Sequence, residues 1–257
     1  MHAAVIAIRP IEKRMPMPSK HAAGCSKCNL RELCLPGGLD AEDLSRIENV
    51  VYARRRVKRG EALYQAGAEF NALYAIHSGS FKTSLFDGEG HEQVSGFFMG
   101  GELLGLEGLG AGLYNAAAVA LEDSEVCVLP YALIEELARE VPALQRRLHT
   151  VLAREIVRDH GVMMLLGTMR SEQRLATFLL NLSARSVRRG YSSSEFHLRM
   201  TREEMGSYLG LKLETVSRLF SQFHDAGLIE VDHKHVRILD VRGLERMLNE
   251  RSARISN

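Results

Sequence analysis

Three of the four cysteines in the chain lie in one short segment, GCSKCNLRELC, at positions 24–34. Cys25, Cys28 and Cys34 have the spacing C-x2-C-x5-C, and the remaining cysteine, Cys127, lies far downstream. Thiolates are soft ligands, and four of them suffice for an iron-sulfur cluster or for a tetrahedral zinc ion. The sequence therefore predicts that these four side chains bind a cluster or a metal ion, with reduced structural thiols as the alternative.

The spacing of the cysteines also constrains the segment that carries them. Two intervening residues let Cys25 and Cys28 face one centre from a single turn, and residues 29–33 loop out so that Cys34 returns to it. A bound metal would hold this segment against the part of the chain that carries Cys127. Loss of the metal would release the segment, because much of the binding free energy of such a site is ordering free energy.

Length and composition indicate a soluble protein of more than one domain. A chain of 257 residues exceeds the usual single domain, so we expect two domains with separate cores. We recognise no secretion signal and no run of about 20 apolar residues, and we expect a cytoplasmic protein without a membrane segment. In that reducing compartment cysteines are more plausibly ligands than disulfides. Residues 170–257 hold 15 Lys and Arg against 11 Asp and Glu, a mildly basic balance that permits DNA binding.

The first part of the chain has the pattern of a small β domain. Residues 1–20 contain three prolines and are expected to form a disordered lead-in, and residues 39–50 are expected to form a short amphipathic helix. The pattern then changes to short apolar runs separated by glycines, at 73–76, 81–86 and 126–129. This alternation predicts an antiparallel β-roll or barrel.

A glycine-rich stretch at 100–112 has two possible interpretations. Glycines let backbone N–H groups approach an anion, so the stretch could cradle a phosphate. Against this, no Arg or Lys lies between Gly105 and Leu121, and Glu102 and Glu107 would repel an anion. We therefore interpret the stretch as a tight connection between strands.

A long helix is expected after Pro142. Six residues of this helix follow one another at alternating intervals of three and four, which is typical of a coiled-coil seam. They are His149, Leu152, Ile156, Asp159, Met163 and Leu166. This seam favours a homodimer over a helix that only covers its own domain. Two copies of Asp159 about 4 Å apart would repel by roughly 1 to 4 kcal/mol, which would poise dimerisation near balance.

The C-terminal part begins with an amphipathic helix. We expect that helix over 171–183, a polar linker over 184–195 and a short strand over 196–200. Thr201 then opens a further helix, and Glu204 completes a T-x-x-E capping box with it. These features place a second folded unit after the long helix.

Two glycines and another amphipathic helix complete a helix-turn-helix pattern. Gly206 leaves room for a close helix crossing, and Gly210 can supply the left-handed residue that ends the first helix. The second helix, over about 213–226, has an inward apolar stripe of Val216, Leu219, Phe220 and Phe223. Its outward face carries Glu214, Ser217, Arg218 and Ser221.

The outward face of this helix has the chemistry of base recognition. Arg contacts guanine O6 and N7 bidentately and Glu accepts from cytosine N4, each worth roughly 1 to 3 kcal/mol of discrimination. Both residues lie at the N-terminal end, which is the end that enters the major groove. The runs 228–231 and 236–239 are expected to form a hairpin wing, with His233 and Lys234 near the phosphates. A merely solvated polar face is the alternative.

The chain resembles the cyclic-AMP-receptor superfamily of bacterial transcription regulators and, within it, the fumarate and nitrate reduction regulator (FNR) family of oxygen sensors. The resemblance covers about residues 20–245. It is most specific in the four cysteines, in FLLNLSARSVRRGYSSSEFHLRMTREEMGSYLGL and in the recognition-helix sequence LETVSRLF. It implies an α+β fold with an N-terminal antiparallel β-roll sensor domain (21–142), a long dimerisation helix (143–170) and a C-terminal winged helix-turn-helix (171–257).

The resemblance also implies a cofactor, partners and site residues. The four cysteines would bind an oxygen-labile 4Fe-4S cluster, and Ile156 and Asp159 would be the dimer-switch positions. The DNA site would be a palindrome resembling TTGAT and ATCAA separated by four base pairs, read by Glu214, Ser217 and Arg218. The loop at 83–90 resembles a surface presented to RNA polymerase. A cyclic nucleotide is not expected, since the arginine that would neutralise its phosphate is missing.

The expected function is therefore oxygen-responsive control of transcription. We recognise no paired acid-base or nucleophile constellation, and we do not expect an enzyme. Lys27 and Asn29 depart from the closest family patterns beside the ligands, where neighbours affect cluster exposure and hydrogen bonding. Two alternatives are a winged-helix regulator with a structural zinc on the same cysteines and an iron-sulfur electron carrier.

Overall fold

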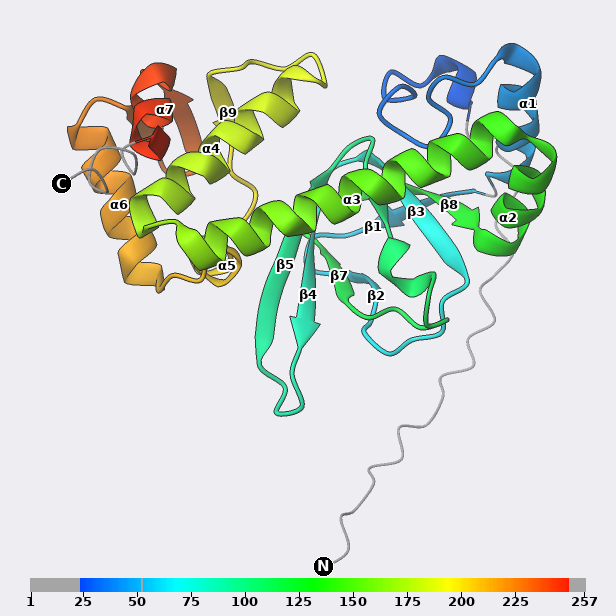
Figure 1. Ribbon diagram of the computed structural model, residues 1–257, viewed down its shortest axis with the longest axis horizontal. Helices are drawn as coiled ribbons and strands as arrows, with labels where there is room; N and C mark the ends of the chain where they lie inside the picture. The colour runs from blue at the N-terminus through cyan, green and yellow to red at the C-terminus, as the bar shows by residue number, and fades with distance from the viewer. Residues whose placement is uncertain (1–23, 52, 250–257) are drawn as a thin grey trace, which may run out of the picture.

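The computed structural model describes residues 24–51 and 53–249 of the chain (Figure 1). A β-roll is followed by the long helix α3 (Pro142–Thr168), which leads to a C-terminal domain of helices and a small sheet. This α+β architecture is the one predicted from the sequence. The predicted lead-in, residues 1–20, lies outside the described residues.

The roll consists of two four-stranded antiparallel sheets, with strand orders β1-β8-β3-β6 and β2-β7-β4-β5. Its strands are Ala53–Val57 (β1), Ala62–Tyr64 (β2), Ala72–Ser78 (β3), Ser80–Phe86 (β4), Glu92–Met99 (β5), Leu103–Leu104 (β6), Ala117–Ala120 (β7) and Ser124–Pro130 (β8). The three predicted apolar runs lie in β3, β4 and β8. They are strands because side chains such as Ile76, Phe81 and Val126 are buried in one core between the sheets.

The glycine-rich stretch connects strands, as predicted. Gly101 and Gly105 have φ values of 86° and 91°, a left-handed conformation that glycine adopts without strain. They let the chain leave β5, form the two-residue strand β6 and enter the 3-10 turn Leu106–Gly108.

Two short helices flank the start of α3. These are α1 (Ala41–Val50) and α2 (Tyr131–Glu140). Asp40 caps α1 by accepting a hydrogen bond from the Asp43 N–H group at 2.9 Å. Leu35, Leu44, Ile47, Ile134 and Leu144 share one core beneath these helices. The segment that carries the three clustered cysteines is therefore packed against the start of α3.

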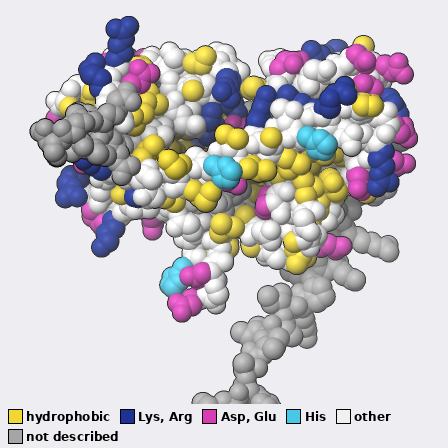
Figure 2. All heavy atoms as spheres, viewed as in Figure 1, with side chains coloured by type: hydrophobic (Ala, Val, Ile, Leu, Met, Phe, Trp, Pro, Cys, Tyr) yellow, Lys and Arg dark blue, Asp and Glu magenta, His cyan; other side chains and the backbone are white. Residues whose placement is uncertain are grey.

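Helix α3 has an apolar face that the described part of the chain leaves open. Leu144 and Leu148 near its start and Leu165 near its end are buried. Between them Ile156, Val157, Met163 and Met164 are 56%, 69%, 62% and 59% exposed. Figure 2 shows hydrophobic side chains gathered along this helix.

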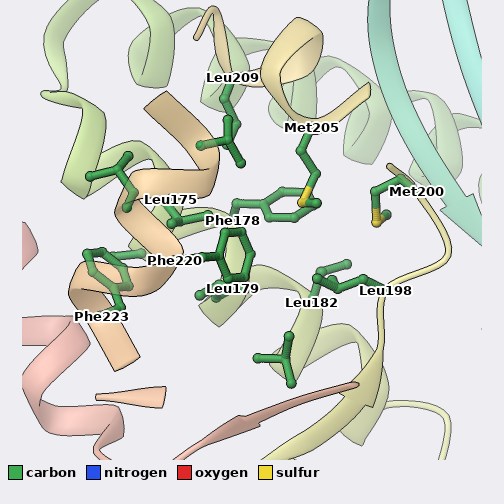
Figure 3. Packing of buried hydrophobic residues seen from close by; sticks show 14 of the residues in the cluster. Leu175, Phe178, Leu179, Leu182, Leu198, Met200, Met205, Leu209, Phe220 and Phe223 are labelled. Carbon is green, nitrogen blue, oxygen red and sulfur yellow. The ribbon is translucent and has the colours of Figure 1, made fainter. Parts of the chain in front are cut away.

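The C-terminal domain contains α4 (Ser171–Val187), α5 (Arg202–Leu209), α6 (Leu213–Asp225) and α7 (Val241–Asn249). Its sheet has the order β10-β11-β9, from Ile229–Asp232 (β10), His235–Ile238 (β11) and Glu195–His197 (β9). Leu175 and Phe178 of α4 meet Met205 of α5 and Phe220 of α6 in one core (Figure 3). The helix-turn-helix is thus built on a packed core.

Two local predictions in this domain were wrong. The helix predicted to end at Ser183 continues to Val187, so the first residues of the predicted linker are helical. The extra turn carries Arg185, whose guanidinium is held by the distant carboxylate of Glu102. The strand predicted at 196–200 is shorter and begins earlier, because β9 pairs only with the first three residues of β11.

The predicted capping box and helix crossing are confirmed. Thr201 Oγ1 accepts from the Glu204 N–H group at 3.1 Å, and Glu204 Oε2 accepts from the Thr201 N–H group at 2.7 Å. A Cβ atom on Gly206 would lie 2.6 Å from the Leu211 carbonyl oxygen. Gly210 ends α5 with φ 62°. Helices α5 and α6 therefore have a fixed relative position.

Candidate metal centre and nucleic-acid interface

The four cysteines come together around one small cavity of about 30 Å³. Cys25 begins a 3-10 turn, Cys28 and Cys34 follow in the next residues of the loop, and Cys127 lies in β8. Strand β8 is paired on both sides, by β1 and by β3. One thiol is therefore fixed by a sheet, whereas the other three depend on how the loop is held.

Burial raises the pKa of three of these thiols in the metal-free chain. The pKa of Cys25 and of Cys34 rises to about 12, and the pKa of Cys127 rises to about 11. Neighbouring thiols add to the effect of burial, whereas the guanidinium of Arg54 lowers the pKa of Cys25 and Cys127. Metal ligation needs thiolates, so binding must displace protons. The cavity accordingly suits a group that brings positive charge.

His77 of β3 is a neighbour of the cavity that the sequence did not identify as a site residue. Its Nδ1 lies 4.0 Å from Cys28 Sγ, and its Nε2 lies 3.8 Å from Glu125 Oε2. Burial and Arg54 lower the pKa of His77, while Glu125 opposes them. His77 is distant from every cysteine in the sequence, so only the packing of the loop on the sheet reveals the contact.

The thiols share one cavity, whose donor atoms limit what it can bind. Within residues 24–51 and 53–249, no three His, Cys, Asp or Glu side chains converge closely enough to hold a single metal ion. All four cysteines nonetheless line the same cavity. Four soft donors at one cavity are the donor set of an iron-sulfur cluster, in which each thiolate binds a different iron.

The cysteine loop is attached to the long helix. Arg147 of α3 donates from Nη2 to the carbonyl oxygens of Cys34 at 2.8 Å and Glu32 at 2.7 Å, and from Nε to Cys34 at 3.1 Å. Leu144 and Leu148 of α3 lie in the same core as Cys25. A rearrangement of the loop therefore acts directly on α3.

The outward face of α6 is exposed, as its pattern predicted. Glu214, Ser217 and Arg218 lie in the N-terminal half of the helix and are exposed to solvent. The opposite side is fixed, since Phe220 is buried and the guanidinium carbon of Arg202 lies 3.2 Å from its ring centroid. The face is thus presented by a helix that is anchored from behind.

The predicted hairpin wing is present. Asp232 and His235 are its last paired residues, and His233 and Lys234 form the turn between β10 and β11. His233 has φ 53° and its Nδ1 lies 2.7 Å from Asp232 Oδ1. Lys234 Nζ donates to the Arg199 carbonyl oxygen at 3.4 Å. The tip places these two side chains beside the helix-turn-helix.

The two predicted dimer-switch residues lie on the open face of α3. Ile156 and Asp159 are both exposed. The other face of the helix meets the roll, where the guanidinium carbon of Arg158 lies 4.0 Å from the Phe98 ring centroid. Glu155 pairs with Arg158, and burial raises the pKa of Glu155 to about 7 despite that pairing, with a further contribution from Asp159.

Aromatic side chains fill the interior of the roll. The ring centroids of Tyr64 and Tyr114 are 4.0 Å apart, and those of Tyr64 and Tyr74 are 5.8 Å apart. The Tyr114 hydroxyl donates to the Ala72 carbonyl oxygen at 2.7 Å. Burial raises the pKa of Glu107, which faces Tyr64. The tyrosine rings and Glu107 therefore occupy the interior of the roll.

Comparisons with known proteins agree with this description. A cyclic nucleotide-binding domain model matches residues 54–141, and a Crp-like helix-turn-helix domain model matches residues 173–247. The solved structure of FixK2 from Bradyrhizobium japonicum has a TM-score of 0.70 and 27% identity, covering 76% of this chain and 96% of that one. None of the described helices has the length and apolar character needed to cross a bilayer. The fold and site thus define a DNA-binding transcription regulator.

Relatives identify the family. The transcriptional regulatory protein btr of Bordetella pertussis is 46% identical, covering 94% of this chain and all of that protein. The transcriptional activator protein FnrA of Stutzerimonas stutzeri is 43% identical, covering 88% and 93%. The fumarate and nitrate reduction regulatory protein of Escherichia coli K12 is 37% identical, covering 84% and 87%. The chain belongs to the FNR family of the cyclic-AMP-receptor superfamily, whose members bind DNA and typically dimerise.

Proposed function

We propose that this protein controls transcription in response to O2 through a 4Fe-4S cluster bound by Cys25, Cys28, Cys34 and Cys127. The observation that carries the proposal is that four thiols from a loop and a distant strand line one cavity. Four cysteine thiolates can hold either a cluster or a zinc ion, and the resemblance to the FNR family favours the cluster. Bound iron would also stabilise thiolates that burial alone disfavours. When bound, the cluster supplies the oxygen-labile chemistry of the sensor.

The chain's own residues link the cavity to dimerisation. When the loop is closed on the cavity, Arg147 holds two of its carbonyl groups to α3. Ile156 then favours pairing of two α3 helices, whereas Asp159 opposes it by roughly 1 to 4 kcal/mol. A repulsion of that size leaves the monomer and the dimer close in free energy. The ordering of the loop can then decide between them, because a few kcal/mol moves such an equilibrium almost completely.

Dimerisation in turn places two recognition helices on DNA. Half-sites about one helical turn apart, roughly 34 Å, would each receive one α6 helix. Glu214, Ser217 and Arg218 would read a palindrome resembling TTGAT and ATCAA separated by four base pairs. Oxidation of the cluster would separate the pair and weaken specific binding, because one half-site supplies half of the contacts.

Two further expectations concern partners. The hairpin of β4 and β5 projects from the roll, and its end at 83–90, with Phe86 47% exposed, would contact RNA polymerase (Figure 1). A cyclic nucleotide would not bind, since stacked tyrosines such as Tyr64 and Tyr114 occupy the roll interior. The protein would act in the cytoplasm, where the thiols remain reduced.

The proposal is tested with protein purified without air. Iron and acid-labile sulfide should each reach about four per chain, and sedimentation should show a dimer that becomes a monomer in air. A colourless protein with zinc and no sulfide would instead establish the structural zinc alternative. A dimer unchanged by air would contradict the switching step. Binding a half-site duplex no better than a scrambled one would favour an electron carrier.

A further inference from the structure

The carboxylate of Glu102 joins the roll to the C-terminal domain. It accepts from Arg185 Nη2 at 2.6 Å and Nε at 3.1 Å, and from Arg189 Nη2 at 2.6 Å. Arg185 lies in the last turn of α4 and Arg189 lies two residues beyond its end, and their side chains are only 15% and 4% exposed. These charge-assisted hydrogen bonds are shielded from water, which strengthens them. They attach the C-terminal end of α4 to the roll.

The same two arginines also donate hydrogen bonds to backbone carbonyl groups that precede Glu102. Arg189 Nε donates to the Gly100 carbonyl oxygen at 2.7 Å, and Arg185 Nη2 donates to the Phe97 carbonyl oxygen at 2.7 Å. Glu102 itself accepts from the Met99 N–H group at 3.0 Å. The geometry of this attachment is therefore set by the conformation of the turn at 100–102.

The cysteine loop packs on that turn from the other side. A Cβ atom on Gly100 would lie 2.8 Å from Leu30 Cδ1, and one on Gly101 would lie 2.8 Å from Leu33 Cβ. Only glycines allow the loop to approach this closely. Leu30 lines the cysteine cavity and also the cleft of about 700 Å³ between the roll and the C-terminal domain, which Arg189 lines too.

We propose that the turn at 100–102 is a relay through which the position of the cysteine loop sets the position of the DNA-binding domain within one protomer, with Glu102 as the positioning residue. The path runs from Leu30 and Leu33 through the two glycines to Glu102 and from there to α4. It is separate from the path through Arg147 to the dimer interface. The trigger that moves the loop rests on the proposed function, whereas the relay rests on the contacts of Leu30, Leu33 and Glu102.

Removal of the loop has a definite physical consequence. Leu30 and Leu33 shield the turn, and without them water reaches Glu102 and its two arginines, whose hydrogen bonds weaken as the local dielectric rises. The roll and the domain also meet through Phe97, whose ring centroid lies 5.9 Å from that of Phe178 and 5.3 Å from that of Tyr208, and through Lys82 and Glu204 at 3.2 Å. When the loop leaves, the end of α4 therefore loses its fixed position on the roll, and the domain can change its orientation about the Phe97 contact.

The experiment is a double-mutant cycle on the full-length protein as purified without air, read by amide hydrogen exchange at 183–190, the last turn of α4 and the residues that follow it. Leu30→Ala and Glu102→Gln should each accelerate exchange there by about tenfold. The double variant should be no faster than either single variant, because both changes interrupt one path. Leu33→Ala provides a second change on the loop side. Arg188→Ala, which removes an exposed charge from the same helical turn, should leave the exchange unchanged.

The outcomes separate the relay from the proposed function. Unchanged exchange at 183–190 in both Leu30→Ala and Leu33→Ala would overturn the relay, and so would additive effects of Leu30→Ala and Glu102→Gln. Glu102→Asp, which keeps the charge, should restore most of the protection. Neither measurement requires iron, so absence of a cluster would refute the proposed sensor without changing the result of the cycle.

Discussion

The cysteine cavity and the outward face of α6 are held in place in opposite ways. The recognition residues Glu214, Ser217 and Arg218 project from α6, whose other side is buried in the domain core. The preceding helix α5 begins with a capping box. Three of the four thiols lie on a loop with one 3-10 turn, which Arg147 and a shared apolar core hold to α3. The recognition face is therefore carried by a regular helix, whereas most of the thiol cavity is carried by a loop.

This contrast fits the two tasks. A surface that reads base pairs gains specificity from side chains held rigidly, since misplaced donors lose bidentate contacts. A sensor must change when its ligand is lost, so it is drawn from the part of the fold with low local stability. The predictions below ask whether the two regions are as independent as their structures indicate.

The largest expected effect comes from Cys127→Ala, which removes the thiol that a strand holds. Iron and sulfide in protein prepared without air should fall close to zero, because three thiols leave one iron without a protein ligand. Circular dichroism should remain unchanged, since the C-terminal core does not contact Cys127. Ser26→Ala, at an exposed position between two cysteines, is the control and should keep its iron. Full iron in Cys127→Ala would show that the ligand set is wrong.

The next largest effect is expected for Asp159→Ala, on the open face of α3. Removing a like-charge pair should strengthen the dimer by roughly 1 to 4 kcal/mol, enough for a dimer in air. Ile156→Ala should act in the opposite direction by removing apolar contact across the seam. Sedimentation equilibrium of both variants in air measures this. A monomeric Asp159→Ala protein would argue against repulsion as the switch.

Arg218→Ala should weaken DNA recognition and leave the cysteine cavity unaffected. Binding to the palindrome should weaken by about 1 to 3 kcal/mol for each half-site, while the iron content stays at the wild-type value. Fluorescence anisotropy with operator and scrambled duplexes measures the change. Arg242→Ala removes an equal charge from an exposed position on α7 and should not alter the preference for the operator. An equal loss on both duplexes would assign Arg218 to phosphate contact.

The smallest effect concerns Glu155, on the face of α3 that meets the roll. Its pKa is raised from 4.5 to about 7 by burial, so the folded chain retains a proton that the unfolded chain releases. Stability should therefore be complete below about pH 4.5 and decline as the pH rises through 7. Glu155→Gln should stabilise the metal-free protein by about 1 to 2 kcal/mol at pH 8 and little at pH 5. Urea unfolding at both pH values measures this, and an equal gain at both would contradict it.

The local sequence pattern predicted the structure correctly wherever an element depends only on residues close together in the chain. The strands at 73–76 and 126–129 follow from short apolar runs, and the capping box of Thr201 and Glu204 follows from a four-residue motif. The pattern failed at the end of α4. The polar residues after Ser183 read as a linker, yet they continue the helix because Arg185 finds its partner on the roll.

The sequence by itself determined which residues carry the chemistry: four thiols, a recognition helix with a polar face, and a seam with one acidic member. It did so because residue type and short-range spacing are properties of the chain alone. Only the tertiary structure decided that His77 and Arg147 adjoin the cysteine loop and that Glu102 joins two domains. Those contacts join residues far apart in sequence, and they exist only once sheets and helices have packed.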